Sequence, residues 1–183
     1  MKGAFFSAAL LAALVFPALS ISCNLSGDTT GERVTDCPDD IAQRAFRFAE
    51  LSETSGAEYE FGGQSPLRSV PMIDCSGLVV MCYKYALVDT QYSLLLDDMS
   101  AAYMYESASR LISLEQARKG DLVFMGEPDS SNISHIALFD EKKDGNISFI
   151  DSTEKEGING VSRRSYPEND GRFKAFGVML LQY

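Results

Sequence analysis

Residues 74–81 read Asp-Cys-Ser-Gly-Leu-Val-Val-Met, a short polar run followed at once by an apolar run that continues to Ala86. From Cys75 to Ala86 the apolar residues recur at spacings of three and four, which predicts an α-helix with a buried face. Asp74 can cap this helix through its side-chain oxygen. Cys75 then lies in the first turn, where the positive end of the helix dipole favours a thiolate. The stretch therefore predicts a nucleophile, although a free cysteine in such a place is more often a small core residue.

Length and composition point to one ordinary globular domain. The chain has 183 residues, of which 45% are hydrophobic and 23% charged, too few for two separate cores. A net charge of −10 argues against nucleic acid or an anionic membrane surface as a partner.

The N-terminus has the features of an export signal. Lys2 precedes an apolar stretch over 4–19, and small residues follow, so we predict a signal peptide at 1–22, a polar tether at 23–37 and the folded domain at 38–183. Residues 19–23, Leu-Ser-Ile-Ser-Cys, resemble a bacterial lipoprotein cleavage site, which implies lipidation of Cys23. Cleavage after Ser20 or Ser22 would instead release a periplasmic or secreted protein.

The cysteines and histidine give no metal pattern. There are four cysteines without CxxC spacing and one histidine, so a structural zinc site is not expected. If Cys23 is lipidated and Cys75 is catalytic, Cys37 and Cys82 are left as a possible disulfide of an exported protein.

The rest of the chain separates into helices followed by strands. Pro38 and two aspartates open a predicted helix with the stripe Ile41, Ala45, Phe48 and Leu51. Loop dominates 53–73, and 88–112 reads as loop with one or two short helices, whose stripe Leu95, Met99, Ala102 and Tyr103 is core rather than ligand site. About five antiparallel strands follow, at 122–125, 133–139, 146–151, 157–162 and 173–181. This order predicts an α+β fold.

His135 is the one imidazole available to Cys75 as a general base. It lies in the predicted strand 133–139 and shares a face with Ala137 and Phe139, which also suits a hydrogen-bonded core histidine. A cysteine at a helix start beside a sheet that holds a histidine is the geometry of cysteine acyl transfer.

Four ordered motifs resemble the NlpC family of papain-like bacterial cell-wall cysteine peptidases. They are Tyr59-Glu60-Phe61-Gly62-Gly63, Asp74-Cys75-Ser76-Gly77-Leu78-Val79, Gly120-Asp121-Leu122-Val123-Phe124 and Ser134-His135-Ile136-Ala137-Leu138-Phe139. The resemblance implies a papain-like fold and cleavage of peptidoglycan stem peptides between D-glutamate and the diamino acid.

The resemblance also implies roles for individual residues. Cys75 would be the nucleophile, His135 the base and Asp151 the third member, with Ser152 and Glu154 as rivals for that last role. Tyr59, Asp74, Ser76 and Ser134 would contact substrate, Asp74 and Ser76 through a free amine. Two departures stand out: related enzymes often have histidine where Asp151 lies, and residues 67–72 lengthen the loop before Cys75.

We therefore expect an exported cell-wall cysteine peptidase, anchored to the bacterial envelope through Cys23, with no metal or organic cofactor. Its partner would be stem peptides rather than nucleic acid, and its membrane contact only the lipid. A Cys-His amidase or acyltransferase with another substrate, or an inactive wall-peptide-binding lipoprotein, are the rival hypotheses.

Overall fold

The computed structural model describes residues 33–65, 69–155 and 157–183. The predicted signal peptide at 1–22, Cys23 and most of the predicted tether lie outside these residues, as does Leu67 in the lengthened loop. All described residues belong to one unit, residues 32–183. None of the helices in the described ranges is long and apolar enough to cross a membrane.

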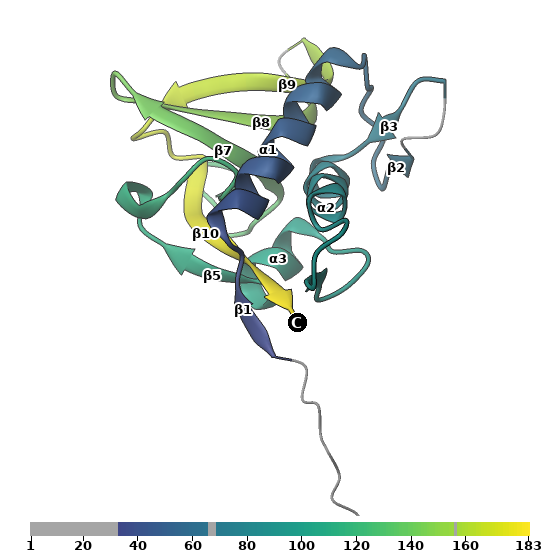
Figure 1. Ribbon diagram of the computed structural model, residues 1–183. Helices are drawn as coiled ribbons and strands as arrows, with labels where there is room; N and C mark the ends of the chain where they lie inside the picture. The colour runs from purple at the N-terminus through teal and green to yellow at the C-terminus, as the bar shows by residue number, and fades with distance from the viewer. Residues whose placement is uncertain (1–32, 66–68, 156) are drawn as a thin grey trace, which may run out of the picture. The chain divides into compact units, whose positions relative to one another are not determined.

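The five predicted strands form the centre of an antiparallel sheet, which confirms the α+β class (Figure 1). They are β6 (Leu122–Met125), β7 (His135–Lys143), β8 (Asn146–Lys155), β9 (Ile158–Pro167) and β10 (Phe173–Gln182). The sheet has eight strands in its described part, rather than about five. Its order is β1-β10-β6-β7-β8-β9, and β10 also pairs with β4 and β5.

The additional strands are short. β1 (Val34–Asp36), β4 (Ser93–Leu94) and β5 (Ser109–Ile112) all pair with β10. These segments mix polar and apolar residues, so they show none of the short apolar runs by which the other strands were predicted. The predicted tether is therefore wrong at its end, because β1 belongs to the folded domain.

In the part of the chain that the structure describes, three helices accompany the sheet: α1 (Asp39–Thr54), α2 (Cys75–Ala86) and α3 (Ala101–Ser107). A 3₁₀ turn lies at Leu114–Gln116, and β2 (Gln64–Ser65) pairs with β3 (Met72–Ile73) within the predicted loop 53–73. α2 has the predicted bounds. Its residues 77–83 are all buried because α1 contacts it on one side and β7 and β8 on another (Figure 1).

The predicted apolar stripe of α1 is wrong at its C-terminal end. Leu51 is 63% exposed, and the half-buried Phe48 stacks on Tyr85 of α2 with ring centroids 4.7 Å apart. The buried face consists of Ile41, Ala42, Ala45, Phe46 and Ala49. The small alanines let α1 approach its neighbours closely, a packing choice that apolar spacing alone does not reveal.

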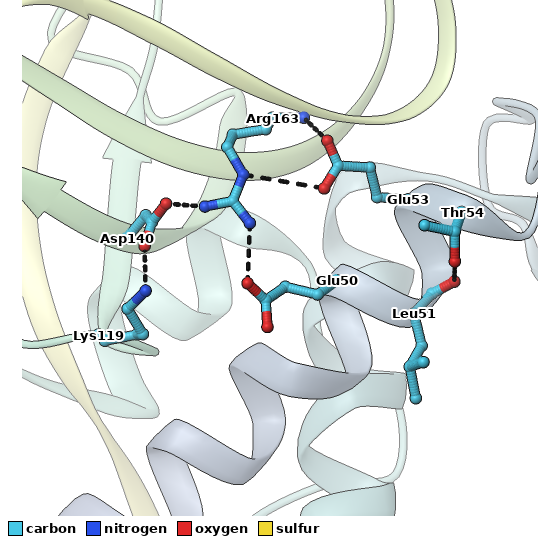
Figure 2. A network of polar contacts seen from close by, with 7 residues as sticks. All are labelled: Glu50, Leu51, Glu53, Thr54, Lys119, Asp140 and Arg163. Atoms are coloured by element: carbon cyan, nitrogen blue, oxygen red, sulfur yellow. Dashed lines mark hydrogen bonds and ion pairs between the residues drawn. The ribbon is translucent and has the colours of Figure 1, made fainter.

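A network of charged residues joins α1 to the sheet (Figure 2). Arg163 of β9 contacts Glu50 and Glu53 of α1 and also Asp140 of β7, which Lys119 contacts in turn. Asp140 is buried, so the two cations offset the cost of removing its charge from water.

Candidate active site

The side chain of Asp74 holds the start of α2. Its Oδ1 accepts the Gly77 N–H at 2.6 Å and the Ser76 hydroxyl at 3.0 Å, so Asp74 is the predicted helix cap. Cys75 is the first residue of α2 and is half-buried. Its thiol therefore lies beside the free N–H groups and the positive end of the helix dipole.

The motif at residues 59–63, which ends in two glycines, and the motif at residues 74–79, which contains Cys75, are joined by hydrogen bonds. Asp74 Oδ2 accepts the Gly62 N–H at 2.9 Å, and the Asp74 N–H donates to the Gly63 carbonyl at 3.0 Å. A Cβ atom on Gly77 would lie 2.3 Å from the Gly63 oxygen, so only glycine permits this contact. Both oxygens of Asp74 thus already serve the backbone, and one lone-pair position remains for a ligand.

Tyr59 is positioned by β9. Its backbone N–H donates to Asn159 Oδ1 at 3.0 Å, and the loop before it lies against Gly160, where a Cβ would come within 1.8 Å of the Ala57 oxygen. Burial, and then the negative charges of Cys75, Asp74 and Glu154, raise the pKa of Tyr59. Its phenol therefore stays protonated and can donate a hydrogen bond.

His135 and Asp151 face each other across β7 and β8. His135 Nε2 lies 2.5 Å from Asp151 Oδ2, and Asp151 is completely buried. The two rivals for this place have other environments: Ser152 donates to the Ile73 carbonyl at 2.6 Å, and Glu154 is exposed. Among the three candidates it is Asp151 that contacts the imidazole.

His135 and Cys75 line the same cavity and interact with each other. Burial alone would lower the pKa of His135, but its interactions with Asp151 and Cys75, and the negative charge of both, raise it from 6.5 to about 9. The imidazole is therefore protonated at neutral pH and can stabilise a thiolate. Because Nε2 contacts Asp151, Nδ1 is the ring nitrogen left for the sulfur.

Two cavities share Cys75 in their walls. One, of about 440 Å³, extends over His135 to Lys155 and Arg164. The other, of about 400 Å³, lies over Asp74, Ser76 and Asp98. Tyr59 and Ser134 also line both. All four residues predicted to contact substrate thus line one or both of the cavities that share the thiol. The first cavity carries both signs of charge, with Glu127 and Glu154 beside Lys155 and Arg164, whereas the charged residues that line the second are acidic.

Comparison with known proteins gives this arrangement a family. Residues 56–172 match the model of the NlpC/P60 family, which is more than half of the chain. The chain belongs to the NlpC/P60 family.

Solved structures share the NlpC/P60 fold of this chain. A protein described as similar to lipoprotein, NLP/P60 family, from Staphylococcus aureus subsp. aureus Mu50 is 26% identical, with a TM-score of 0.55 over 81% of this chain and 43% of that one. NlpC1 from Trichomonas vaginalis is 17% identical, with a TM-score of 0.54 over 78% of this chain and 45% of that one. Ly7917 is 13% identical, with a TM-score of 0.51 over 75% of this chain and 62% of that one.

The chain spans less than two thirds of the length of each of these proteins. No curated protein matches it in sequence.

One residue of this NlpC/P60 site was missed by the sequence analysis. Arg164 of β9 contacts both oxygens of Asp151, donating from Nε to Oδ1 at 3.0 Å and from Nη2 to Oδ2. Arg163 and Arg164 stand out in the sequence as adjacent cations. Which of them reaches Asp151 depends on the pairing of β8 with β9, which the sequence does not state.

The cysteines of this NlpC/P60 domain are unpaired where the structure describes them. Cys37, Cys75 and Cys82 are free thiols, so the possible Cys37–Cys82 disulfide is not formed. Burial raises the pKa of Cys37 to about 12 and that of Cys82 further, which leaves both as inert core thiols. Within the described ranges no group of three His, Cys, Asp or Glu side chains could hold a metal ion.

Proposed function

We propose that this protein is a cysteine peptidase that hydrolyses peptidoglycan stem peptides, with Cys75 as nucleophile, His135 as base and Asp151 as orienting carboxylate. The observation that carries the proposal is the contact chain from Cys75 to His135 to the buried Asp151. Membership of the NlpC/P60 family supports the choice of a cell-wall peptide as substrate.

The proposed reaction starts with Cys75 as a thiolate and His135 as a protonated imidazole. The Cys75 thiolate attacks the peptide carbonyl carbon, and His135 gives its proton to the leaving amine as the C–N bond breaks. A thioester on Sγ remains. Neutral His135 then takes a proton from water, whose oxygen attacks the thioester carbon as the C–S bond breaks. The carboxylic acid leaves and gives its proton to solvent, and the Cys75 thiolate is again beside protonated His135. Asp151 keeps the imidazole in one orientation throughout, and no metal or organic cofactor is needed.

The two cavities suit the two sides of the scissile bond. We place the free amine of the stem peptide in the cavity with Asp74, Ser76 and Asp98, where its ammonium meets carboxylates. The diamino acid would then occupy the cavity that extends over His135 to Lys155. The bond cut is the one between D-glutamate and the diamino acid, and Tyr59 and Ser134 lie at the border between the two sides.

The proposed place of action is the bacterial cell envelope. A signal peptide over 1–22 would export the chain, and a lipid on Cys23 would hold it near the wall. The support is the run of residues 19–23, together with the lipoprotein named in the description of the Staphylococcus aureus relative.

The test compares Cys75→Ala with Cys82→Ala on purified wall peptides, read by mass spectrometry. Cys75→Ala should abolish the appearance of new amine and carboxyl ends, because the nucleophile is lost. Cys82→Ala should keep most of the activity, since Cys82 lies on the buried face of the same helix and is only 1% exposed. Cleavage by folded Cys75→Ala would refute the assignment. A wild-type protein whose Cys75 alkylates readily but which cuts no wall peptide would point to another substrate.

A further inference from the structure

Arg164 reaches Asp151 through the pairing of two strands. Phe149 of β8 lies opposite Arg164 of β9, and Asp151 lies opposite Ser162. Side chains two residues apart on a strand share a face, so Arg164 is the diagonal neighbour of Asp151. The planar guanidinium presents two donors, Nε and Nη2, to the two carboxylate oxygens, a pairing that lysine cannot reproduce.

The guanidinium is itself fixed in place. It lies over the rings of Phe149 and Tyr166, with its Cζ 5.4 and 5.3 Å from the ring centroids. Its Nη1 donates to the Tyr166 hydroxyl at 2.5 Å. The Arg164 side chain is 9% exposed, so the aromatic residues and the hydroxyl hold it in one conformation.

Asp151 needs such a partner because it has no contact with water. An isolated carboxylate in a buried place takes up a proton, and a protonated carboxyl is a weak partner for an imidazolium. His135 contacts only Oδ2 of Asp151, whereas Arg164 contacts both oxygens. Arg164 therefore supplies the permanent charge, and it also fixes the plane of the carboxylate.

We propose that Arg164 is a positioning residue of the active site, which keeps Asp151 ionised and aligned so that Asp151 can orient His135. This inference rests on the proposed function for the roles of Cys75, His135 and Asp151. It extends the contact chain to a fourth residue, and it assigns a role to the buried cation that lines the cavity over His135.

The charge of Arg164 should also affect the pH dependence of Cys75 alkylation. His135 is faced by Cys75 from α2 and Asp151 from β8, and the surrounding cavity carries Tyr59, Glu127, Glu154, Lys155, Tyr166 and Arg172. Removing one positive charge from this cluster makes the neighbouring acids hold their protons more tightly. We therefore expect the pH midpoint of Cys75 alkylation to lie about one unit higher when this charge, several ångströms away, is removed.

The experiment separates charge from geometry with two substitutions. Arg164→Met removes both, and it should lower kcat about ten- to a hundredfold with little change in KM and move the midpoint of Cys75 alkylation with pH upward by about one unit. Arg164→Lys keeps the charge but not the paired donors. It should lower kcat less and leave the alkylation midpoint close to that of the wild type.

Arg163→Met is the matched control. Arg163 is the next residue on β9 and also pairs with a buried aspartate, Asp140, but it faces α1 (Figure 2). Its loss should lower the free energy of unfolding and leave the alkylation midpoint unchanged. If Arg163→Met moves the midpoint as much as Arg164→Met does, the effect is one of stability and the inference fails.

A double variant tests whether Arg164 acts through Asp151. In an Asp151→Ala background, Arg164→Met should reduce kcat no further, within about twofold, because its target is gone. If the losses in kcat from Asp151→Ala and Arg164→Met multiply in the double variant, Arg164 acts on something other than Asp151. Alkylation needs no substrate, so it tests this inference separately from the proposed function. If the alkylation midpoint of folded Arg164→Met equals that of the wild type, the inference fails even where the wild type cleaves wall peptides. If the midpoint shifts upward, the inference is supported even where the wild type cleaves no wall peptide. If Arg164→Met does not fold, Arg164→Lys decides: unchanged kcat overturns the inference.

Discussion

At the scale of single residues, Asp121 carries a charge in an unfavourable place. It is 5% exposed, and its Oδ2 accepts the Arg118 N–H at 2.8 Å. Burial is the main cause that raises its pKa from 3.8 to about 6, and the charges of Arg118 and Arg110 only partly offset this. The folded protein therefore binds this proton more tightly than the unfolded chain does. The contribution of Asp121 to stability is largest below pH 3.8 and is lost as the pH rises to about 6.

Asp121→Asn should consequently stabilise the protein at neutral pH and not in acid. The amide oxygen can keep the hydrogen bond from Arg118 while the charge is absent. We expect a gain of roughly 1–3 kcal/mol in the free energy of unfolding at pH 7, which disappears near pH 4. Urea unfolding of both proteins between pH 4 and 8 measures it. A difference that is constant over this range would contradict the linkage to Asp121.

At the scale of elements, a hydrogen bond from the sheet helps to position the start of α2. The buried hydroxyl of Ser152 in β8 donates to the carbonyl of Ile73, two residues before Cys75. Asp151, the neighbour of Ser152, contacts His135 from the opposite face of the same strand. β8 therefore contacts both the segment that leads into the helix of Cys75 and the side chain of His135.

Ser152→Ala should weaken both stability and catalysis. The Ile73 carbonyl would stay buried without its donor, which costs about 1–3 kcal/mol in the free energy of unfolding. A small shift of the helix start should lower kcat more than it raises KM. Ser148→Ala, a half-buried serine toward the other end of β8, serves as control and should change neither much. Wild-type kcat in Ser152→Ala would show that α2 is held by its other contacts.

At the scale of the whole molecule, the acidic domain has to be brought to its substrate. The chain has a net charge of −10, so electrostatic attraction to an anionic membrane surface is not available to it. The proposed lipid on Cys23 would supply the location instead, and the residues between Cys23 and β1 would set the distance from the membrane.

Cys23→Ala tests this anchoring in a bacterium that expresses the full chain. The substituted protein should move from the detergent-soluble membrane fraction to the aqueous fraction, because the acceptor of the lipid is lost. Cys37→Ala is the matched control, since Cys37 is buried in the domain and should leave the distribution unchanged. Membrane association that persists in Cys23→Ala would rule out lipidation at this position.

Local patterns in the sequence determined the start of α2, the five main strands and the two central residues of the site. A cap beside an apolar helix pattern places Cys75 without knowledge of any distant contact, and the strands show as short apolar runs next to turn residues. His135 was available because the chain has no other histidine. The helix start and the strands depend on residues close together in the chain, which is why these elements agree with the structure. The roles of Cys75 and His135 stay predictions.

Tertiary structure alone decided which carboxylate, serine and arginine belong to the site. Asp151, Ser152 and Glu154 are near neighbours in the chain, and only the pairing of β7, β8 and β9 turns Asp151 toward both His135 and Arg164. The same holds for β1, whose three residues form a strand because β10 lies beside them. A side chain's role in such places depends on register between distant segments, which packing of the whole domain sets and local sequence does not encode.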